Sequence, residues 1–435
     1  MRVLCISKYP PIEGGVSTLC YFSAIEAARN GHEVEIVTNS LETEYGRREL
    51  ILTEDRSRLD RKGINVSYTQ PLVEGCYVPS ANPFVSKLLG LALAVSDRFH
   101  PELIVGWYME PYGLAASLLG THLGIPVGFI HAGSDIGSLA EHPDLGRAYS
   151  MVAGSVDYCL TSDNPRIAGK IAECGFHDEA IQFSQYFPLP KLYRKTASEL
   201  NLAKTCTEAV SFFRAYPLDQ LLIDNLLQTN LKKLDTAAPT IGVYGKIGDG
   251  KGSFQLLDAL EEIASSGRSF NFITIPSGSA ALLTNYYERI TSSKLLSDSS
   301  WILPPVAPWR IPNLLALCDI ACNLEHNFHV EFHSSVITRE ILASGTTLAC
   351  TQDAIKSVQL DRHIVDDLSA MVIDDPNDTS TLSGRIGSLI DDRARCAAIG
   401  RRGKAISALL EDHAPGKMPL LQIIDRVFRS ESTDI

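Results

Sequence analysis

The first half of the chain alternates short runs of β-branched and aromatic residues with longer segments whose apolar residues recur at helical spacing. Strands are expected at 2–7, 33–38, 64–69, 102–107, 125–131, 156–161 and 181–184. Helices are expected between them at 16–30, 82–98, 110–124, 138–150 and 164–175. Such alternation is typical of a parallel sheet covered by helices on both faces. The pattern therefore predicts a doubly wound α/β domain over residues 1–187.

The pattern changes after this domain and then returns. Residues 188–238 are polar with helical spacing and no strand, which predicts a linker enlarged into two or three helices. Further strands are expected at 240–245, 270–275, 301–303, 319–323 and 346–350, and helices at 252–266, 278–292, 311–317, 336–345 and 378–432. We therefore expect a second α/β domain over 239–410 and a C-terminal helix, 411–435, that packs back on the first domain. Facing domains of this kind place a substrate cleft between the carboxyl ends of their strands.

Charge and composition exclude several classes of protein. The 435 residues contain 39 Lys+Arg and 51 Asp+Glu, which gives a formal net charge of −12. An acidic chain without a dense Lys/Arg tract lacks the positive surface that holds phosphate backbones, so we expect no nucleic-acid partner. The longest apolar stretch, 88–95, is too short to span a bilayer, although peripheral membrane contact stays open.

The ten cysteines are scattered, mostly inside apolar runs, without the paired spacing of a zinc site. They are predicted to be reduced core residues, and no metal site is expected. The chain begins with a short strand-like run rather than a long apolar segment followed by small residues. We therefore expect a cytoplasmic protein.

Two segments that follow strands in the first half carry candidate chemistry. Gly14 and Gly15 precede a helix whose first N–H groups could hold an anion or a polyol. The run FIHAGSDIG places His131, Ser134 and Asp135 in a loop that could bind a sugar or a phosphate. A Gly-Gly turn and a lone His also occur as purely structural features. The absence of G-x-G-x-x-G, P-loop and G-x-S-x-G motifs disfavours a dehydrogenase, a P-loop NTPase and a serine hydrolase.

The first strand of the second half leads into GVYGKIGDGKGSFQ. Its glycines leave backbone N–H groups bare, Lys246 and Lys251 add two positive charges, and Gly252 opens a helix. That combination suits a diphosphate, which needs cations as well as amide donors. The alternative is a solvated turn with two surface lysines.

A third cluster lies in EHNFHVEFHSSVITREILASG. Glu340 occupies an otherwise apolar helix, where a buried carboxylate needs a partner. A ribose diol is one candidate, and an ordinary ion pair with Arg339 or Arg310 is the other. Either serine of the pair before the helix is a natural N-cap. The candidate polar residues of this cluster that precede the helix are Glu325, Glu331, His333, Ser334 and Ser335.

The order of these segments resembles a known family. PPxxGGV near residue 10, HAGSD near 131, G-K-x(4)-K-G near 245 and a REILASGT helix are similar to the family 4 glycosyltransferases of the GT-B fold. The resemblance covers the chain except the helical region around 190–238. It implies two Rossmann-like domains that face each other across a cleft, with the acceptor mostly on the first and a nucleotide sugar mostly on the second.

The resemblance also implies roles for individual residues. Glu340 would bind the ribose, and Lys246 would hold the diphosphate although family members usually have Arg there, so the charge is kept but the bidentate fork is lost. The other donor-binding residues expected are Gly14, Gly15, Lys251, Gly252, Ser334 and Ser335. The family's E-x7-E motif is displaced here, because counting back eight residues from Glu340 reaches Phe332. The catalytic residues expected are therefore His131, Glu331 and His333, and the acceptor-binding residues are Ser134 and Asp135.

The expected function is transfer of a sugar from a nucleotide-diphosphate donor to an acceptor hydroxyl of a small molecule, glycan or lipid-linked molecule. The resemblance implies retention of configuration and no cofactor besides the nucleotide sugar. The lack of a D-x-D cluster agrees with a metal-independent site, because lysines and helix dipoles would neutralise the diphosphate. A nucleotide-sugar epimerase, a sugar phosphorylase and a non-catalytic GT-B partner subunit remain alternatives. The run WILPPVAPWR resembles the border of the nucleobase pocket, with Pro304, Pro305 and Trp309 as its walls.

Overall fold

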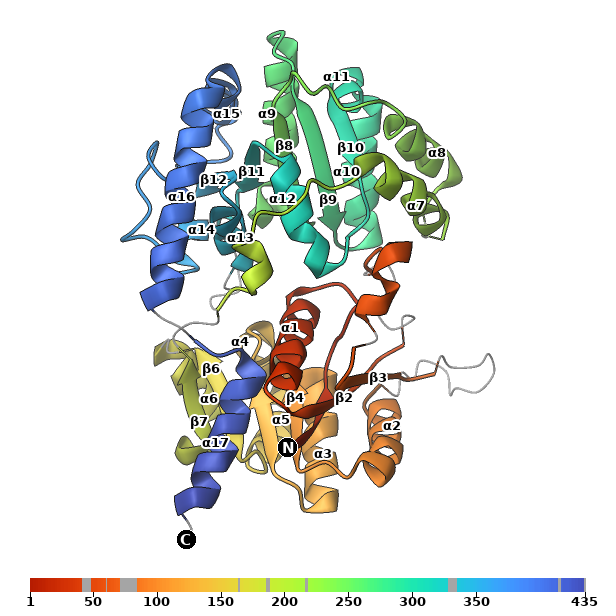
Figure 1. The fold of residues 1–435 in the computed structure, drawn as a ribbon, viewed down its shortest axis with the longest axis vertical. Helices are drawn as coiled ribbons and strands as arrows, with labels where there is room; N and C mark the ends of the chain where they lie inside the picture. The colour runs from red at the N-terminus through yellow and green to blue at the C-terminus, as the bar shows by residue number, and fades with distance from the viewer. Residues whose placement is uncertain are drawn as a thin grey trace.

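The computed structural model describes residues 1–40, 48–59, 61–70, 84–162, 165–184, 188–215, 218–327, 335–413 and 416–433. It contains two parallel sheets, each with helices on both faces, stacked along the long axis of the molecule (Figure 1). The predicted α/β class with two doubly wound domains is therefore confirmed.

The first sheet has the strand order β3-β2-β1-β4-β5-β6-β7. Its strands are β1 (Arg2–Ile6), β2 (Glu33–Thr38), β3 (Ile64–Tyr68), β4 (Leu103–Trp107), β5 (Val127–Ile130), β6 (Tyr158–Ser162) and β7 (Ile181–Ser184). Its helices are α1 (Gly15–Arg29), α2 (Phe84–Phe99), α3 (Leu114–Leu123), α4 (Ser134–Gly137), α5 (Pro143–Ala153) and α6 (Pro165–Glu173). The central strands are almost wholly buried, because a parallel sheet covered on both faces needs continuous apolar strands. The chain changes direction between β1 and β4, which opens a crevice there.

The second sheet has the order β10-β9-β8-β11-β12-β13 and its own switch between β8 and β11. Its strands are β8 (Thr240–Lys246), β9 (Asn271–Ser277), β10 (Ser300–Ile302), β11 (Ile320–Asn323), β12 (Thr347–Thr351) and β13 (Met371–Ile373). The helices are α9 (Ser253–Ser265), α10 (Ala280–Ser292), α11 (Lys294–Ser299), α12 (Ile311–Leu317), α13 (Val336–Ser344), α14 (Gln352–Lys356), α15 (Thr379–Asp391) and α16 (Arg393–His413).

Two helices that come between the two sheets in the chain order extend the second domain. α7 (Leu202–Arg214) and α8 (Gln220–Thr229) follow the first sheet in the chain. Their apolar residues, Phe213 and Leu226 among them, join the core that covers one face of the second sheet. The segment predicted as an enlarged linker thus contributes to a packed core.

The last helix, α17 (Pro419–Thr433), returns to the first domain and packs on α1 and β6 (Figure 1). The amide of Met418 donates to Glu26 of α1 at 2.9 Å. A Cβ atom on Gly128 of β5 would lie 2.8 Å from the Cγ2 atom of Ile423, so only glycine allows this close approach. The chain thus crosses between the domains a second time before α17, and backbone and side-chain contacts hold that helix on the first domain.

Several predicted elements differ from those observed. The helix expected at 110–124 begins with a π-helical turn, η3 (Met109–Gly113), before α3. The helix expected at 138–150 is divided into η4 (Leu139–Glu141) and α5, because Pro143 starts a new helix and cannot continue an old one. The stretch expected at 378–432 forms α15, α16 and α17, and β13 was not predicted. Short 3₁₀ turns complete the fold at η2 (Thr53–Arg58), η5 (Asp178–Ala180), η6 (Lys191–Tyr193), η7 (Asp249–Lys251) and η8 (Pro308–Arg310).

The two domains meet along a seam formed by residues 48–58 of the first domain and 303–310 of the second. The amide of Glu49 donates to the carbonyl of Pro11 at 2.8 Å, and the next amide, of Leu50, donates to the carbonyl of Pro305 at 2.6 Å. Arg310 pairs with Asp55 at 2.5 Å and also with Glu54. The seam is therefore held by backbone bonds and by an ion-pair network.

Candidate active site

The loops that follow the strands of both sheets face each other across the seam. Glu13, in the loop after β1, accepts a hydrogen bond from the hydroxyl of Ser277 at the end of β9 at 3.0 Å. Leu50, in the segment between β2 and β3, bonds to Pro305 after β10. The carboxyl edges of the two sheets thus enclose the candidate site, as expected for ligands of such domains.

The Gly14–Gly15 turn opens α1 at the crevice between β1 and β4. Gly14 has φ 136°, a backbone conformation that side chains disfavour, and no side chain caps the helix start. A Cβ atom on either glycine would meet no atom within 4 Å. The helix N-terminus therefore combines uncapped amides with open space, which suits the predicted role in anion binding.

The His131 loop is organised around a buried carboxylate. Asp135 is fully buried and accepts hydrogen bonds from the amides of Met109 and Ile136, each at 2.9 Å. His131 Nε2 lies 3.4 Å from Asp135 Oδ1, and His131 Nδ1 lies 3.1 Å from the hydroxyl of Thr161. The side chain of Ser134 lies outside the described part of the structure. Because its oxygens are used inside the protein, Asp135 positions the loop and His131 rather than offering an acceptor contact as predicted.

The loop after β4 contributes Glu110, a residue that the sequence analysis missed. Tyr108 has φ 68°, a strained value for a residue other than glycine, directly before the π-helical turn. Glu110 lies in that turn, half-buried, and burial raises the pKa of its carboxyl group. Among the described residues its carboxylate accepts no hydrogen bond. Glu110 has non-helical backbone angles, φ −105° and ψ 120°, and the strained Tyr108 before it is the structural signal for this position.

In the phosphate loop predicted after β8, one of the two lysines is paired with a buried carboxylate. Lys246 ends β8 and is exposed. Lys251 instead forms an ion pair with Glu325, which is 3% exposed, and burial lowers the pKa of this lysine while the carboxylate opposes the shift. Gly252 has φ 64°, and a Cβ atom there would lie 2.4 Å from that of Leu324. The loop therefore exposes Lys246 and holds Lys251 through Glu325.

Glu340 is buried in α13 and is held by tyrosines. Its Oε2 accepts a hydrogen bond from the hydroxyl of Tyr244 at 2.8 Å. Burial raises the pKa of Glu340, whereas the hydroxyls of Tyr244 and Tyr193 and the charge of Arg339 oppose that shift. The sequence analysis singled out neither tyrosine. Tyr193 ends the 3₁₀ turn η6 of the inter-domain linker and Tyr244 lies inside strand β8, so neither stands near Glu340 in the sequence.

The ion-pair alternative for Glu340 is not the observed arrangement. Arg339 donates to Glu411 of α16 at 2.9 Å, and Arg310 pairs with Asp55 across the seam. The Glu340 carboxylate is therefore bonded by neutral hydroxyl groups and not by a guanidinium.

The segment before α13 is described only in part. Glu331, His333 and Ser334 lie outside the described residues, so their predicted roles stay predictions. Ser335 occupies the N-cap position of α13 without a side-chain cap bond, and its hydroxyl accepts from Asn323 at 3.0 Å. Within the described residues, no side chain caps the start of α13.

The predicted walls of a nucleobase pocket are used for packing between domains. Trp309 is 4% exposed and its ring lies 4.8 Å from that of Tyr21 in α1. Pro304 and Pro305 are buried as well. These side chains do not form open walls, because Ala307 and Trp309 join the core of the first domain and Val306 joins a core of the second.

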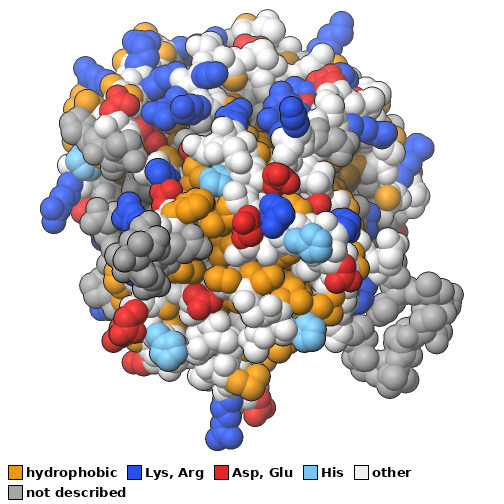
Figure 2. All heavy atoms as spheres, turned by 60° about the horizontal axis from the view of Figure 1, so that its bottom comes forward, with side chains coloured by type: hydrophobic (Ala, Val, Ile, Leu, Met, Phe, Trp, Pro, Cys, Tyr) orange, Lys and Arg blue, Asp and Glu red, His pale blue; other side chains and the backbone are white. Residues whose placement is uncertain are grey.

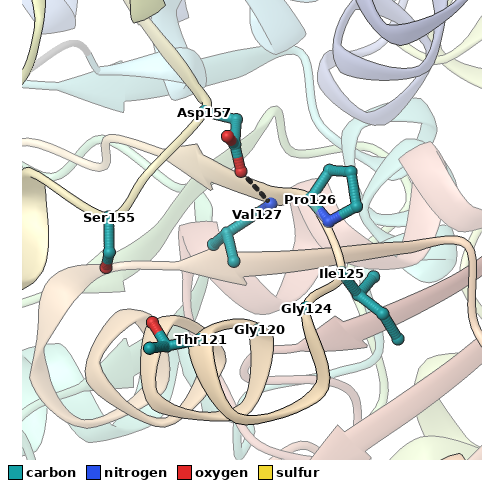
Figure 3. Close-up of a pocket in the computed structure, with 8 residues that line it drawn as sticks. All are labelled: Gly120, Thr121, Gly124, Ile125, Pro126, Val127, Ser155 and Asp157. Carbon is teal, nitrogen blue, oxygen red and sulfur yellow. Dashed lines mark hydrogen bonds between the residues drawn. The ribbon is translucent and has the colours of Figure 1, made fainter.

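The far end of the first domain carries a separate hollow. A cavity of about 260 Å³ is lined by the end of α3, the start of β5 and the turn before β6 (Figure 3). Asp157 there accepts a hydrogen bond from the Val127 amide at 2.7 Å. Because Val127 begins β5, this cavity lies at the amino ends of the strands, away from the site. Figure 2 shows apolar side chains on this end of the molecule, mixed with charged and histidine side chains.

Two further properties concern the described residues as a set. Within them, no three His, Cys, Asp or Glu side chains stand close enough together to hold a metal ion. No helix in the same ranges is long and apolar enough to cross a membrane.

Comparison with known proteins identifies the fold. No family model and no curated protein sequence matches the chain. The solved structure of Anabaena Alr3699/HepE in complex with UDP-glucose is 15% identical, with a TM-score of 0.59 over 100% of both chains. WaaG, a glycosyltransferase involved in lipopolysaccharide biosynthesis, is 13% identical with a TM-score of 0.58, over 94% of this chain and 95% of WaaG. A Listeria monocytogenes protein provisionally named a UDP-N-acetylglucosamine 2-epimerase is 11% identical with a TM-score of 0.52, over 95% of this chain and 96% of that chain. The chain has the GT-B fold, as the resemblance implied.

Proposed function

We propose that this protein is a glycosyltransferase that moves a sugar from a nucleoside-diphosphate donor to an acceptor hydroxyl, with retention of configuration. One observation carries the proposal. Lys246 ends β8, and Tyr244 of the same strand bonds to Glu340 of α13, a helix whose start has no side-chain cap among the described residues. A cation and helix amides match a diphosphate, and a carboxylate matches a ribose diol.

The proposed chemistry uses the leaving phosphate oxygen as the proton acceptor. The acceptor hydroxyl attacks the anomeric carbon on the face that the diphosphate leaves, and its proton passes to that phosphate oxygen. Lys246 and the amides of α1 and α13 stabilise the charge that develops on the diphosphate. His131, fixed by Asp135 and Thr161, and the half-buried Glu110 are the candidate contacts to the sugar and the acceptor.

Replacement of Lys246 tests the phosphate site. Lys246→Ala should weaken nucleoside-diphosphate affinity by about 1.5–3 kcal/mol, the range for hydrogen bonds to charged groups. Since this side chain is exposed, the melting temperature should stay at the wild-type value. Calorimetric titration with UDP and GDP measures the affinity, and unchanged values for both nucleotides would refute the phosphate site.

Replacement of Glu340 tests the ribose site. Glu340→Gln should weaken binding of a ribonucleoside diphosphate by about 1.5–3 kcal/mol, because the amide presents one acceptor oxygen where the diol needs two. A 2′,3′-dideoxy nucleoside diphosphate provides the control, since it lacks the hydroxyls in question and should bind both forms equally. If the variant only melts earlier and binds the ribonucleotide normally, Glu340 has a purely structural role.

Transfer should continue in excess EDTA, because the proposed site neutralises the diphosphate with a lysine and helix amides. Product formation from a nucleotide sugar, measured before and after chelation, checks this expectation. Loss of turnover that Mg²⁺ or Mn²⁺ restores would instead require a metal at the diphosphate.

An epimerase is the second candidate, because the Listeria structure shares the fold. Conversion of a nucleotide sugar to its epimer without an acceptor would favour it. Transfer of the sugar to an added acceptor, with release of the nucleoside diphosphate, would favour the glycosyltransferase.

A further inference from the structure

Residues 48–58, called the strap below, belong to the first domain by their place in the chain but are bonded to both domains. Arg48 forms an isolated antiparallel bridge with Ile12, in the loop after β1. Two residues later, Leu50 forms a parallel bridge with Val306, which follows β10 of the second sheet. The backbone of the strap therefore lies between the two domains and contacts one after the other.

The side chains of the strap alternate between the two domains. Leu50 and Leu52 are buried in the core of the second domain, the same core to which α7 contributes Phe213. Ile51, between them, packs against the core of the first domain. Successive side chains of an extended segment point to opposite sides, so this alternation is what a segment between two cores requires. Release of the strap from the second domain would therefore expose two leucine side chains to water.

The polar end of the strap is held by α7, the first α-helix of the insertion. The amide and the hydroxyl group of Thr53 both donate to the carboxylate of Glu208, at 2.8 and 3.2 Å. Lys204 forms an ion pair with Glu54, the next residue of the strap. Because Lys204 and Glu208 are four residues apart, they lie on one face of α7. That face thus offers an acceptor to the start of η2 and a cation to its first acidic side chain.

The contacts of the strap with α7 are more exposed than its ion pair with η8. Arg310 donates to the carboxylate of Asp55 at 2.5 and 2.9 Å, and the exposed fractions of these two side chains are 18% and 2%. In the pair between Lys204 and Glu54 the exposed fractions are 39% and 43%. Dissolved salt screens exposed charges far more than buried ones. The α7 contacts are therefore the part of the network that ionic strength can weaken.

We propose that the helical insertion controls release of the strap: α7 holds the strap on the second domain and so keeps the seam between the domains closed when no ligand is bound. The loops of the candidate site border the same seam, since Glu13 after β1 bonds to Ser277 at the end of β9. The insertion thereby sets the spacing of the two halves of the site and makes that spacing sensitive to salt. No nucleotide contact enters this role, which is therefore independent of the proposed function.

Hydrogen exchange of the full chain without ligand, followed by mass spectrometry, tests this role. The Leu50 amide, which bonds to Pro305 of the second domain, reports release of the strap, whereas the Thr53 amide reports the contact with α7 itself. Lys204→Ala/Glu208→Ala removes both α7 contacts and keeps a good helix former at each position. It should speed exchange at Leu50 on the order of tenfold, the combined effect expected of two partly exposed polar contacts.

Three comparisons accompany the double variant. At about 1 M NaCl, where the Debye length is about 3 Å, exchange at Leu50 should speed up in the wild type and change little in the double variant. Glu54→Gln alters only the strap's side of the ion pair, so it should speed exchange at Leu50 by about threefold, and it replaces the double variant if that one does not fold. Arg268→Ala/Asp391→Ala removes an exposed ion pair within the second domain and should leave exchange at Leu50 unchanged.

Two results would overturn the proposal. If the Thr53 amide alone exchanges faster in the double variant and Leu50 stays protected as in the wild type, α7 makes only a local contact. If the amides of the central strands β8 and β9 accelerate by the same factor as Leu50 and the melting temperature falls with them, the protein is destabilised as a whole and the strap is not released separately. Neither result depends on nucleotide affinity, so failure of the proposed function is detected separately.

Discussion

Glu411→Ala should lower the free energy of unfolding by about 3–5 kcal/mol, the usual cost of removing one partner from a buried ion pair. Glu411 is 4% exposed and accepts from Arg339 at 2.9 Å and from the amide of Leu189 at 3.3 Å. It therefore joins the two chain segments that cross between the domains. Urea unfolding followed by circular dichroism measures the loss.

Asp412→Ala provides the matched control. Asp412 follows Glu411 in the same helix and pairs with Arg194 at 3.8 Å, but its side chain is 74% exposed. Exposed ion pairs contribute roughly 0–1 kcal/mol, so this variant should unfold nearly as the wild type does. Equal stability losses in the two variants would show that helix composition, rather than the buried pair, explains the effect of Glu411.

Lys251→Ala should cost stability as well as nucleotide affinity. It leaves the carboxylate of Glu325 buried without the ammonium that now faces it, which we expect to cost about 3–5 kcal/mol of unfolding free energy. Affinity for a nucleoside diphosphate should fall by a further 1.5–3 kcal/mol or so if the lysine also contacts the phosphates. Thermal unfolding without ligand and calorimetry with nucleotide measure the two losses separately.

The double variant Lys251→Met/Glu325→Leu distinguishes the two roles of this lysine. Apolar side chains of similar size often replace a buried ion pair without loss of stability, so the double variant should regain the melting temperature. It should still bind nucleotide weakly, because the cation is absent. Lys294→Ala, which removes an exposed pair with Asp298, should change neither property. Wild-type nucleotide affinity in the double variant would remove Lys251 from the phosphate site.

The sequence predicted those loops of the candidate site that directly follow strands. The loops after β1, β5 and β8 were located correctly, because a turn of glycines and polar residues ends each apolar run. Glu340 was singled out because a carboxylate inside an apolar helix face requires a partner. The sequence could not identify that partner, because Tyr244 lies 96 residues away from Glu340 in the chain.

The amino-acid sequence by itself determined the fold class, the order of the elements and the two-domain plan. Hydrophobic periodicity is a local property, so it marks strands and helices wherever flanking turn residues delimit them. Hydrophobic periodicity did not predict the turn at Met109–Gly113. There the amide of Met109 donates to the carboxylate of Asp135, which belongs to another loop.

Only the tertiary structure decided which of these polar side chains are bonded or packed inside the protein and which are not. It turned Asp135 and Trp309 inward, paired Lys251 with Glu325, and left the Oε2 atom of Glu49 without a hydrogen-bond partner among the described residues. Each outcome depends on which loops meet in space, and those loops lie far apart in the chain. The physical reason is that a polar side chain acquires its role from the donors and acceptors packed around it, and sequence spacing does not encode that packing.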